Sequence, residues 1–415
     1  MINKIKKLIK SDNLDGYVVP KNDKYFTEYS KINYLKEVSN FSGSAGFAVI
    51  LKKKNYLFVD GRYTIQAKKE SGNKFKIFEI PYKWPKDIFK ELNIGFDPNL
   101  FTHSGLYKYF ENSCNLIPIN KNLFSNKFKF IRNKPFYLLN NKVSGETSKK
   151  KIKKTIKLLK KKKLNYFYIS SGENICWLLN MRGHDLPNSP VANCKLILTE
   201  KKKIYFFSPK AKILKIKSKL KNLKISFNEE KDFFKVLLSL KSGNFCIDHQ
   251  TCSIFDEELI KSKFKINNKI DPIYYFKSIK NKTEINNMKK AHINDGIALT
   301  KFLYWAKNTN IKKMTEKKIE LKLEKFRKLN KNYLFPSFDT IAGSGSNGAI
   351  IHYRSDKYSN RKLHHKDLLL LDSGGQYKWG TTDVTRTVCF SKPTDKIKEL
   401  FTRVLKGHIG VALSN

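Results

Sequence analysis

The spacing of apolar residues predicts helices that alternate with strands along much of the chain. Residues 4–19 (KIKKLIKSDNLDGYVV) and residues 154–169 (KTIKLLKKKKLNYFYI) align without a gap at an offset of 150. In each stretch, a lysine-rich segment with apolar residues at helical spacing leads through a short turn into a run typical of a buried strand. The repeat predicts two related α/β domains in tandem, and a chance match of a common helix-to-strand pattern is the alternative.

Domain boundaries follow from the same pattern. We expect a first α/β domain over residues 1–132 and a related second domain over residues 133–272. Residues 273–415 form a third region, of the α+β class. In this region a long helix over residues 282–308 and a charged helix over residues 314–329 precede a glycine loop and a β-rich segment.

The charge balance is the most unusual property of the composition. Lys and Arg total 83 against 36 Asp and Glu, which gives a net charge of +47, but only eight of the 83 are arginines. Proteins that read nucleic acids carry arginines at base-reading positions and concentrate their charge on one face, whereas these lysines are spread along the whole chain. We therefore interpret the lysines as a compositional bias, and the runs Lys149–Lys154 and Lys160–Lys163 as solvated helix faces. We expect no specific nucleic-acid partner, only salt-sensitive sticking to polyanions.

Cysteine usage and hydropathy favour a cytoplasmic protein. The six cysteines include no CxxC pair, and nothing at the N-terminus resembles a signal peptide. No apolar stretch approaches the roughly 20 residues that a membrane-spanning helix needs, so we expect no membrane partner. Cys246, His249 and Cys252 have the spacing of part of a zinc site, but no fourth ligand is near them in the sequence.

A glycine-rich loop between residues 341 and 353 reads IAGSGSNGAIIHY and contains the pattern G-x-G-x-x-G. A dinucleotide-binding loop requires its third glycine to open a helix, whose free amides receive the pyrophosphate. Here the glycines run into Ala349–Tyr353, a β-branched and aromatic run that predicts a strand. We therefore do not interpret the loop as a nucleotide site. The loop leads directly to His352, so its role depends on the function of that histidine.

Two aspartates flank a predicted hairpin in the segment LLLLDSGGQYKWGTTDVTRTVCF, residues 368–390. If the turn is centred near Tyr377 and Lys378, Asp372 and Asp383 face each other across the strands at about 5 Å. Two partly buried carboxylates at that separation repel each other strongly. Three alternatives follow: one carboxyl is protonated as in an acid dyad, a divalent cation such as Mn²⁺, Mg²⁺, Co²⁺ or Zn²⁺ lies between them, or both are exposed turn residues.

Several segments in the same order resemble the X-prolyl aminopeptidase (aminopeptidase P) family, one of the pita-bread metallopeptidases. The catalytic-domain segments are FPSFDTIAGSGSNGAIIHY (335–353), LLLLDSGGQYKWGTTDVTRTVCF (368–390) and FTRVLKGHIGVAL (401–413). The upstream segments are FSGSAGFAVI (41–50), DGRYTIQA (60–67), ENICWLLNMRGHDLPNSPV (173–191) and KNKTEINNMKKAHINDGIAL (280–299). The resemblance implies two tandem creatinase/prolidase N-terminal-type α/β domains followed by a pita-bread catalytic domain. It also implies removal of the N-terminal residue from peptides with proline in second position.

The resemblance implies roles for four residues. Asp372 and Asp383 match the first two ligands of the family's dinuclear metal centre, in which Asp383 would bridge both ions and Asp372 would hold one of them bidentately. His352 matches a histidine that contacts substrate and stabilises the tetrahedral intermediate, and Arg62 matches an arginine of the N-terminal domain that contacts peptide. The implied cofactors are two divalent metal ions, with Mn²⁺ preferred over Co²⁺ or Zn²⁺, and the implied assembly is a homodimer.

The family completes its metal centre with a histidine and two glutamates well beyond the second aspartate. These three ligands are missing from the sequence, since His408 matches a non-ligand position and Glu399 lies in an ordinary charged run. We therefore expect the pita-bread domain to be truncated, and the 415-residue chain alone to be inactive and to bind divalent metal weakly. Uncovered strand edges are expected to lower its solubility.

Two other function classes compete with the metallopeptidase. One is a non-catalytic binding protein that uses the pita-bread fold and a basic surface, and the other is a metal-free hydrolase related to creatinase. Neither needs both Asp372 and Asp383, so their retention weighs against both. The even spread of the lysines also weighs against a basic binding surface.

Overall fold

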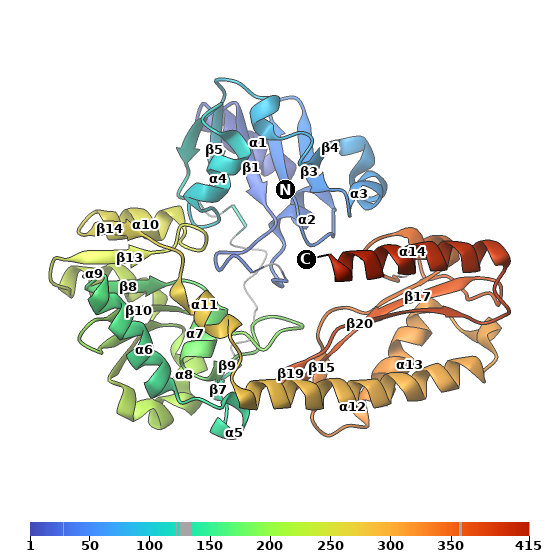
Figure 1. Ribbon diagram of the computed structural model, residues 1–415. Helices are drawn as coiled ribbons and strands as arrows, with labels where there is room; N and C mark the ends of the chain where they lie inside the picture. The colour runs from blue at the N-terminus through green and yellow to red at the C-terminus, as the bar shows by residue number, and fades with distance from the viewer. Residues whose placement is uncertain (28, 122, 125–133, 357–358, 415) are drawn as a thin grey trace. The chain divides into compact units, whose positions relative to one another are not determined.

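The computed structural model describes residues 1–27, 29–121, 123–124, 134–356 and 359–414 (Figure 1). These residues divide into two units, residues 1–286 and residues 287–415. The predicted domain boundary between residues 132 and 133 lies outside the described residues. The predicted boundary between residues 272 and 273 falls at the start of α11 (Pro272–Ser278), whose Ile273 packs into the core beneath the second sheet. Both boundaries stay predictions.

The first sheet has six strands in the order β4-β3-β2-β1-β5-β6 (Figure 1). The strands are β1 (Gly16–Pro20), β2 (Phe47–Leu51), β3 (Asn55–Asp60), β4 (Lys76–Ile80), β5 (Asn93–Phe96) and β6 (Asn115–Pro118). The helices are α1 (Ile2–Ser11), α2 (Tyr34–Ser39), α3 (Thr64–Ser71) and α4 (His103–Phe110), with the short 3-10 helices η1 (Gly72–Lys74) and η2 (Pro85–Asp87). Every residue of β1 is buried, because β1 lies in the middle of the sheet between β2 and β5.

The second sheet also has six strands, in the order β12-β11-β10-β8-β13-β14. The strands are β8 (Tyr166–Ile169), β10 (Lys195–Thr199), β11 (Ile204–Phe207), β12 (Ile225–Asn228), β13 (Asn244–Ile247) and β14 (Lys265–Asn268), while β7 (Tyr137–Leu138) pairs with β9 (Met181–Arg182). The helices are α5 (Asn141–Ser144), α6 (Ser148–Lys161), α7 (Gly172–Leu178), α8 (Lys210–Lys217), α9 (Phe233–Ser239), α10 (Ile254–Lys261) and α11, with η3 (Ser218–Leu223) and η4 (Glu230–Asp232).

The two sheets share one topology. β1 pairs antiparallel with β2 and parallel with β5, and β8 pairs antiparallel with β10 and parallel with β13. The outer strands also correspond. In the first sheet β3–β4 and β5–β6 are parallel pairs at the two edges, and in the second sheet β11–β12 and β13–β14 take the same places. The aligned sequence stretches form α1 and β1 in one case and α6 and β8 in the other. The prediction of two related α/β domains in tandem is confirmed.

Side chains of β8 alternate between two cores. Phe167 and Ile169 pack in one cluster with apolar residues of α6, α7 and α8. Tyr166 and Tyr168 pack in another cluster with residues of α9 and α10. Helices therefore cover both faces of the second sheet, as is typical of sheets with parallel strands.

One lysine of the run predicted to be solvated is buried. Lys151 is only 2% exposed, and it lies on the same stripe of α6 as the buried residues Ile152 and Thr155. Its ammonium donates hydrogen bonds to the carbonyl oxygen of Trp177 at 3.1 Å and to Oδ1 of Asn180 at 2.8 Å. Trp177 belongs to the last turn of α7, where carbonyl groups lack partners within the helix, so Lys151 caps that helix. Burial lowers the pKa of Lys151 to about 8.

Replacement of Lys151 should change how stability depends on pH. The pKa of Lys151 is lower in the folded protein than its ordinary value of 10.5, so between these values the unfolded chain binds more protons and stability rises with pH. Lys151→Met removes this contribution. Between about pH 7.5 and about pH 10.5, urea denaturation should show the wild type gaining up to about 3 kcal/mol of unfolding free energy relative to Lys151→Met. The exposed neighbour serves as control: Lys150→Met should give a pH profile parallel to the wild type, and a parallel profile for Lys151→Met would contradict the burial of its charge.

In residues 287–414, helices pack against a three-stranded sheet with the order β16-β17-β20. The strands are β15 (Tyr333–Pro336), β16 (Ile341–Ser344), β17 (Leu368–Ser373), β18 (Gly375–Tyr377), β19 (Gly380–Thr381) and β20 (Val384–Cys389), and β15, β18 and β19 form a second small sheet. The helices are α12 (Lys282–Lys307), α13 (Glu316–Lys328) and α14 (Asp395–Leu413), with η5 (Ile311–Lys313) and η6 (Gly345–Ala349). The core of this unit joins Phe302 of α12 and Leu323 of α13 to Leu369 and Leu371 of β17.

Burial alternates along β17 and gives the sheet two different faces. Leu369, Leu371 and Ser373 are buried, while the intervening residues, including Leu370 and Asp372, are only partly buried. Successive side chains of a strand point to opposite faces. The side chain of Asp372 therefore projects from the face opposite to α12 and α13.

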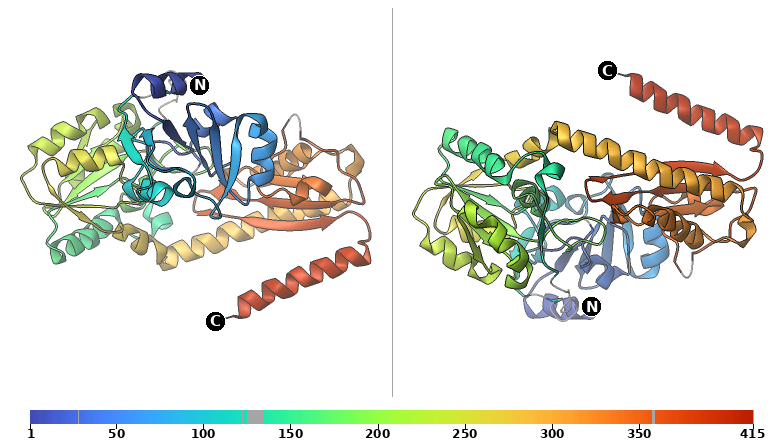
Figure 2. Two further views of the ribbon diagram at one scale, coloured as in Figure 1. Left: turned by 90° about the horizontal axis from the view of Figure 1, so that it is seen from above. Right: turned by 90° about the horizontal axis from the view of Figure 1, so that it is seen from below.

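The last helix, α14, buries none of its residues, and Figure 2 shows it as a separate rod beyond β20. Large apolar side chains are exposed along it, at Leu400, Phe401, Val404, Leu405, Ile409, Val411 and Leu413. Among the described helices, none combines the length and the hydropathy that a membrane crossing requires.

The predicted strand over Ala349–Tyr353 is wrong. These residues form the end of η6 and a turn, because their amides bond locally: that of Ile350 donates to the carbonyl of Asn347 at 3.1 Å, and that of Tyr353 to the carbonyl of Ile350 at 3.2 Å. Gly345 has a φ of +53°, a conformation that favours glycine. The last glycine of the G-x-G-x-x-G pattern lies inside a five-residue 3-10 helix and opens no α-helix, so the loop lacks the anion-binding helix end of a nucleotide site.

Candidate active site

The register of one hairpin sets the positions of the two aspartates. Tyr377 pairs with Gly380 across the turn, and the same register continues into β17 and β20, where Asp372 pairs with Thr385. The prediction that Asp372 and Asp383 stand directly opposite each other is therefore wrong. The turn is centred one residue later than expected, and Asp383 immediately precedes β20.

Asp372 and Asp383 nevertheless lie on the same face of the hairpin, because Asp383 comes two residues before Thr385. Burial raises the pKa of Asp372, a hydrogen bond with Thr385 lowers it, and the charge and hydrogen bonding of Asp383 raise it. Asp383 is therefore an electrostatic neighbour of Asp372. Asp372 is partly buried and Asp383 is exposed, so the pair is open to solvent on one side.

One oxygen of Asp372 has no partner. Its Oδ1 atom is shielded from solvent and makes no hydrogen bond with any described residue. A shielded carboxylate oxygen without a donor is costly, and either a bound cation or a shared proton removes that cost. Asp372 is thus not an exposed turn residue, and two neighbouring carboxylates form an oxygen donor set that suits a hard or borderline divalent ion.

His352 lies close enough to act electrostatically on Asp372, since its charge is one of the causes that lower the pKa of that carboxyl. The backbone of His352 has a φ of +57°, in the left-handed region that a side chain with a Cβ atom adopts at a cost. Such strain persists only where surrounding contacts hold the chain, and it is common at functional sites. The structure therefore places Asp372 and Asp383 on one face of the hairpin, with His352 within electrostatic range of Asp372.

The buried carboxylate of Glu316 holds the loop that carries His352. Glu316, the first residue of α13, is fully buried and accepts hydrogen bonds from the amides of Ser344 and Arg361, both at 2.8 Å. It also accepts from Nδ2 of Asn347 at 3.0 Å and from the hydroxyl of Tyr353 at 2.6 Å. These donors lie on both sides of His352 in the sequence, so one carboxylate fixes both ends of its loop.

A second buried charge ties the helices to the hairpin. Arg327 of α13 donates from Nε and Nη2 to the carboxylate of Asp295 of α12 at 2.7 and 3.0 Å. Arg327 also donates to Oγ of Ser373, the residue after Asp372, at 3.0 Å. The hydroxyl of Tyr377 donates to Asp295 at 2.8 Å. The Arg327–Asp295 pair therefore contacts the hairpin before and after the two glycines at residues 374 and 375.

Arg62 belongs to the other unit of the chain, where it follows β3. Its side chain donates to both carboxylate oxygens of Asp60, at 2.9 and 2.7 Å. Asp60 thus orients the guanidinium of an arginine whose side chain remains 40% exposed.

The described residues hold no group of three or more His, Cys, Asp and Glu side chains arranged to bind a metal ion. This applies to the segment with Cys246, His249 and Cys252 as well as to the surroundings of Asp372. Glu399 pairs with Lys396 and Arg403 on α14, and His408 is exposed on the same helix. Among the described residues, Asp372 and Asp383 are therefore a pair of carboxylates without a third such side chain placed beside them.

Comparison with known proteins identifies the family. The sequence matches the creatinase/prolidase N-terminal domain twice, over residues 1–123 and residues 129–284, and metallopeptidase family M24 over residues 286–412. It is 34% identical to Xaa-Pro aminopeptidase 1 of Dictyostelium discoideum, over 99% of this chain and 70% of that protein. The chain belongs to the M24 metallopeptidase family.

Other relatives of this M24 chain agree. Aminopeptidase P2 of Arabidopsis thaliana is 31% identical, over 96% of this chain and 63% of its own length. The crystal structure of X-prolyl aminopeptidase from Caenorhabditis elegans, described as a cytosolic enzyme with a di-nuclear active site, has a TM-score of 0.86 at 26% identity and covers 95% of this chain and 70% of that one. The chain spans 63% to 70% of the length of these three relatives. The predicted arrangement of two creatinase-type domains followed by a pita-bread M24 domain is confirmed.

Loss of Arg327 should destabilise this unit strongly. Arg327→Ala leaves Asp295 buried without its counter-charge, and we expect it to lower the free energy of unfolding by about 3–5 kcal/mol in urea denaturation. Lys328→Ala is the matched control, because Lys328 is exposed and its pair with Glu324 should contribute no more than about 0.5 kcal/mol. Replacing both partners, Arg327→Met with Asp295→Leu, should recover part of the loss. Equal effects of the two alanine variants would show that the buried pair has no special role.

Glu316→Ala should loosen the loop around His352. The amides of Ser344 and Arg361 lose their acceptor, so their hydrogen exchange should accelerate by about tenfold or more in the folded protein, as followed by mass spectrometry or NMR. Glu320→Ala is the control, since Glu320 lies on the same helix and pairs with the exposed Lys317. Unchanged protection at both amides in Glu316→Ala would contradict the role given to Glu316.

Proposed function

We propose that this chain carries metal-binding and substrate-binding residues of an X-prolyl aminopeptidase, which removes the N-terminal residue from peptides with proline in second position. Relatives of that name match nearly the whole chain, which supports the activity. The observation that carries the proposal for the site is the shielded Oδ1 of Asp372, which has no partner among the described residues and lies beside Asp383.

Asp372 and Asp383 are proposed to hold two divalent ions together with further ligands, and Mn²⁺ is preferred to Co²⁺ or Zn²⁺. When bound, such a pair of ions lowers the pKa of a water molecule and polarises the scissile carbonyl, so that an amide is hydrolysed at neutral pH. The partly buried Asp372 gives the site a rigid carboxylate, while the exposed Asp383 leaves the other side accessible to substrate. For the 415-residue chain alone we expect weak Mn²⁺ binding, because the described residues offer no group of three ligands.

The substrate roles follow from position and chemistry. His352 is proposed to donate a hydrogen bond to the scissile carbonyl, since its loop is fixed by Glu316 and its charge acts on Asp372. Arg62, oriented by Asp60, is proposed to bind a carbonyl or carboxylate group of the peptide. An X–Pro bond has no amide hydrogen, so a site for it must recognise the free amine and the proline ring instead.

The location and the assembly of the protein stay predictions. A cytoplasmic location is supported by the relative from Caenorhabditis elegans, which is described as cytosolic. Homodimerisation rests on family resemblance alone.

Substitution of Asp372 tests the proposed function. In the protein expressed from its own gene, Asp372→Asn should lower kcat/KM for Mn²⁺-dependent release of the first residue of an X-Pro-X peptide by about 1,000-fold, equivalent to about 4 kcal/mol of lost stabilisation. The same peptide with alanine in place of proline should be a poor substrate.

The matched control is Asp395→Asn, because the Asp395 side chain is 98% exposed at the start of α14. It should leave kcat/KM within about twofold of the wild type. Full activity of Asp372→Asn would refute the proposed metal ligand. A wild-type protein without activity toward any X-Pro peptide would instead favour the non-catalytic binding protein.

A further inference from the structure

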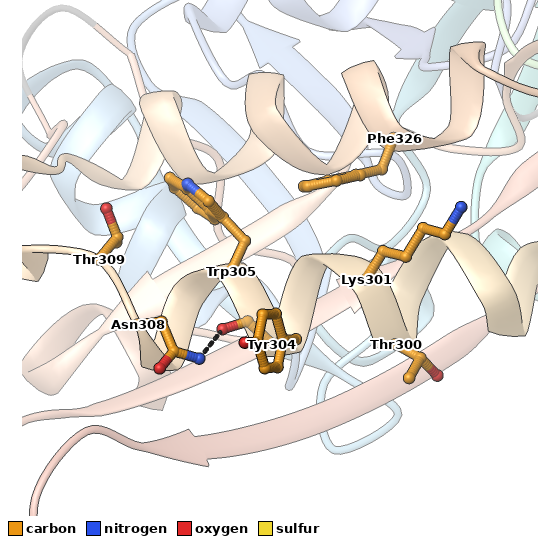
Figure 3. A pocket seen from close by; sticks show the side chains of 7 residues that line it. All are labelled: Thr300, Lys301, Tyr304, Trp305, Asn308, Thr309 and Phe326. Carbon is orange, nitrogen blue, oxygen red and sulfur yellow. Dashed lines mark hydrogen bonds between the residues drawn. The ribbon is translucent and has the colours of Figure 1, made fainter.

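A pocket of about 650 Å³ lies between α12 and α13 (Figure 3). The residues that line it are Thr300, Lys301, Tyr304, Trp305, Asn308, Thr309 and Phe326. Three of these seven side chains are aromatic. Pockets of this size accept one or two bulky side chains of a bound peptide.

The aromatic walls of the pocket are held in place. Trp305 and Phe326 pack with part of their surfaces against the core of the unit. The ammonium of Lys322 lies 4.8 Å from the ring centroid of Trp305 and 5.4 Å from that of Phe326, so one cation contacts both rings. The two rings are therefore held in place next to the same cation before any ligand binds.

An exposed apolar stripe continues from the pocket along α12. Tyr304 is 74% exposed, and Ile297 and Ile293, which lie on the same face of the helix two and three turns earlier, are 51% and 65% exposed. Ile293 and Ile297 are one turn apart, and neighbouring exposed apolar residues mark an interaction site more often than isolated ones do. We call the pocket together with Ile293 and Ile297 the groove.

The charged groups at this groove, Lys301 in its lining and Lys322 over its rings, are positive. No acidic side chain lines the pocket, and Lys301 and Lys322 form no ion pair with any described residue. The acidic residues of α13 near it are already engaged, since Glu320 pairs with Lys317 at 2.7 Å and Glu324 with Lys328 at 2.8 Å. The charge complementary to the groove is therefore negative.

This groove is separate from the candidate active site. It lies on α12 and α13, which pack against the face of β17 formed by Leu369 and Leu371. Asp372 projects from the opposite face of that strand. A ligand in the groove would leave the aspartate pair free.

We propose that this groove binds an acidic peptide segment of a partner protein that presents a bulky apolar side chain. The apolar side chain enters between Trp305 and Phe326, and carboxylates on either side of it meet Lys301 and Lys322. The stripe of Ile293 and Ile297 contacts a second apolar residue of the same segment. Amphipathic segments commonly bind to helical grooves through such regularly spaced anchors.

Fluorescence anisotropy with a labelled peptide tests this proposal. The probe is a fluorescein-labelled peptide of about ten residues, with a Phe-Leu pair flanked by Asp and Glu. Lys301→Glu should weaken its binding by about tenfold or more, and Tyr304→Ser by about fivefold. Lys301 and Tyr304 are both exposed, so neither substitution threatens the fold.

Matched controls separate this site from general electrostatic attraction. Lys282→Glu makes the same change of charge on an exposed residue at the start of α12, three turns before Ile293, and it should weaken binding by less than about twofold. A probe with Ala-Ala in place of Phe-Leu should bind more weakly, and one with Lys in place of the acids should not bind. The proposal is overturned if the acidic probe does not bind, or if Lys282→Glu weakens its binding as much as Lys301→Glu does. It is also overturned if the Ala-Ala probe or a single-stranded oligonucleotide binds as tightly, because the groove would then attract any polyanion.

Discussion

The buried pair of Arg327 and Asp295 is the interaction on which the arrangement of the candidate site depends. It joins α13 to α12, and through Ser373 and Tyr377 it reaches the hairpin that carries the aspartates. Both charged side chains are almost fully buried, so each charge must be compensated by the other or by hydrogen bonds. The two parallel hydrogen bonds between Arg327 and Asp295 provide this compensation. The bidentate contact therefore fixes the hairpin relative to the helices at the residue next to Asp372.

The side chains of β17 alternate between two faces of the sheet, which have different roles. One face of β17 supplies the leucines that pack under α12 and α13, while the other presents Asp372. On that second face a carboxylate oxygen lacks a partner, a second carboxylate lies within reach, and His352 stands on a strained loop. Unsatisfied acceptors and backbone strain both cost stability, and a protein keeps them where a ligand or a reaction uses them. The positive, aromatic groove lies on the opposite side, where the helices are exposed.

The sequence was sufficient to predict the tandem α/β domains, because the helix-to-strand pattern of residues 4–19 recurs at residues 154–169 and forms α1–β1 and α6–β8. It was also sufficient to place Asp372 and Asp383 on one hairpin. The register was wrong by one residue at the turn, since no strong turn signal such as Asn-Gly marks its centre. The strand predicted after the glycine loop was wrong because local turn hydrogen bonds outweighed the β-propensity of its isoleucines.

The buried charges were missed for a different reason. Asp295, Glu316 and Lys151 look like ordinary helix-surface residues in a chain so rich in charge. A signal was present, because Asp295 shares its helical stripe with Ala291 and Phe302, and Lys151 shares one with Ile152. A charge on an apolar stripe predicts a buried partner, but the partners come from residues distant in sequence and are set only by tertiary packing.

The most direct test of this account is the anomalous scattering of manganese in crystals of the protein expressed from its own gene and soaked in Mn²⁺. If Asp372 and Asp383 hold metal, a peak appears in contact with both carboxylates and is lost in Asp372→Asn. A site without a peak, in which the two carboxyl groups share a proton instead, would contradict it.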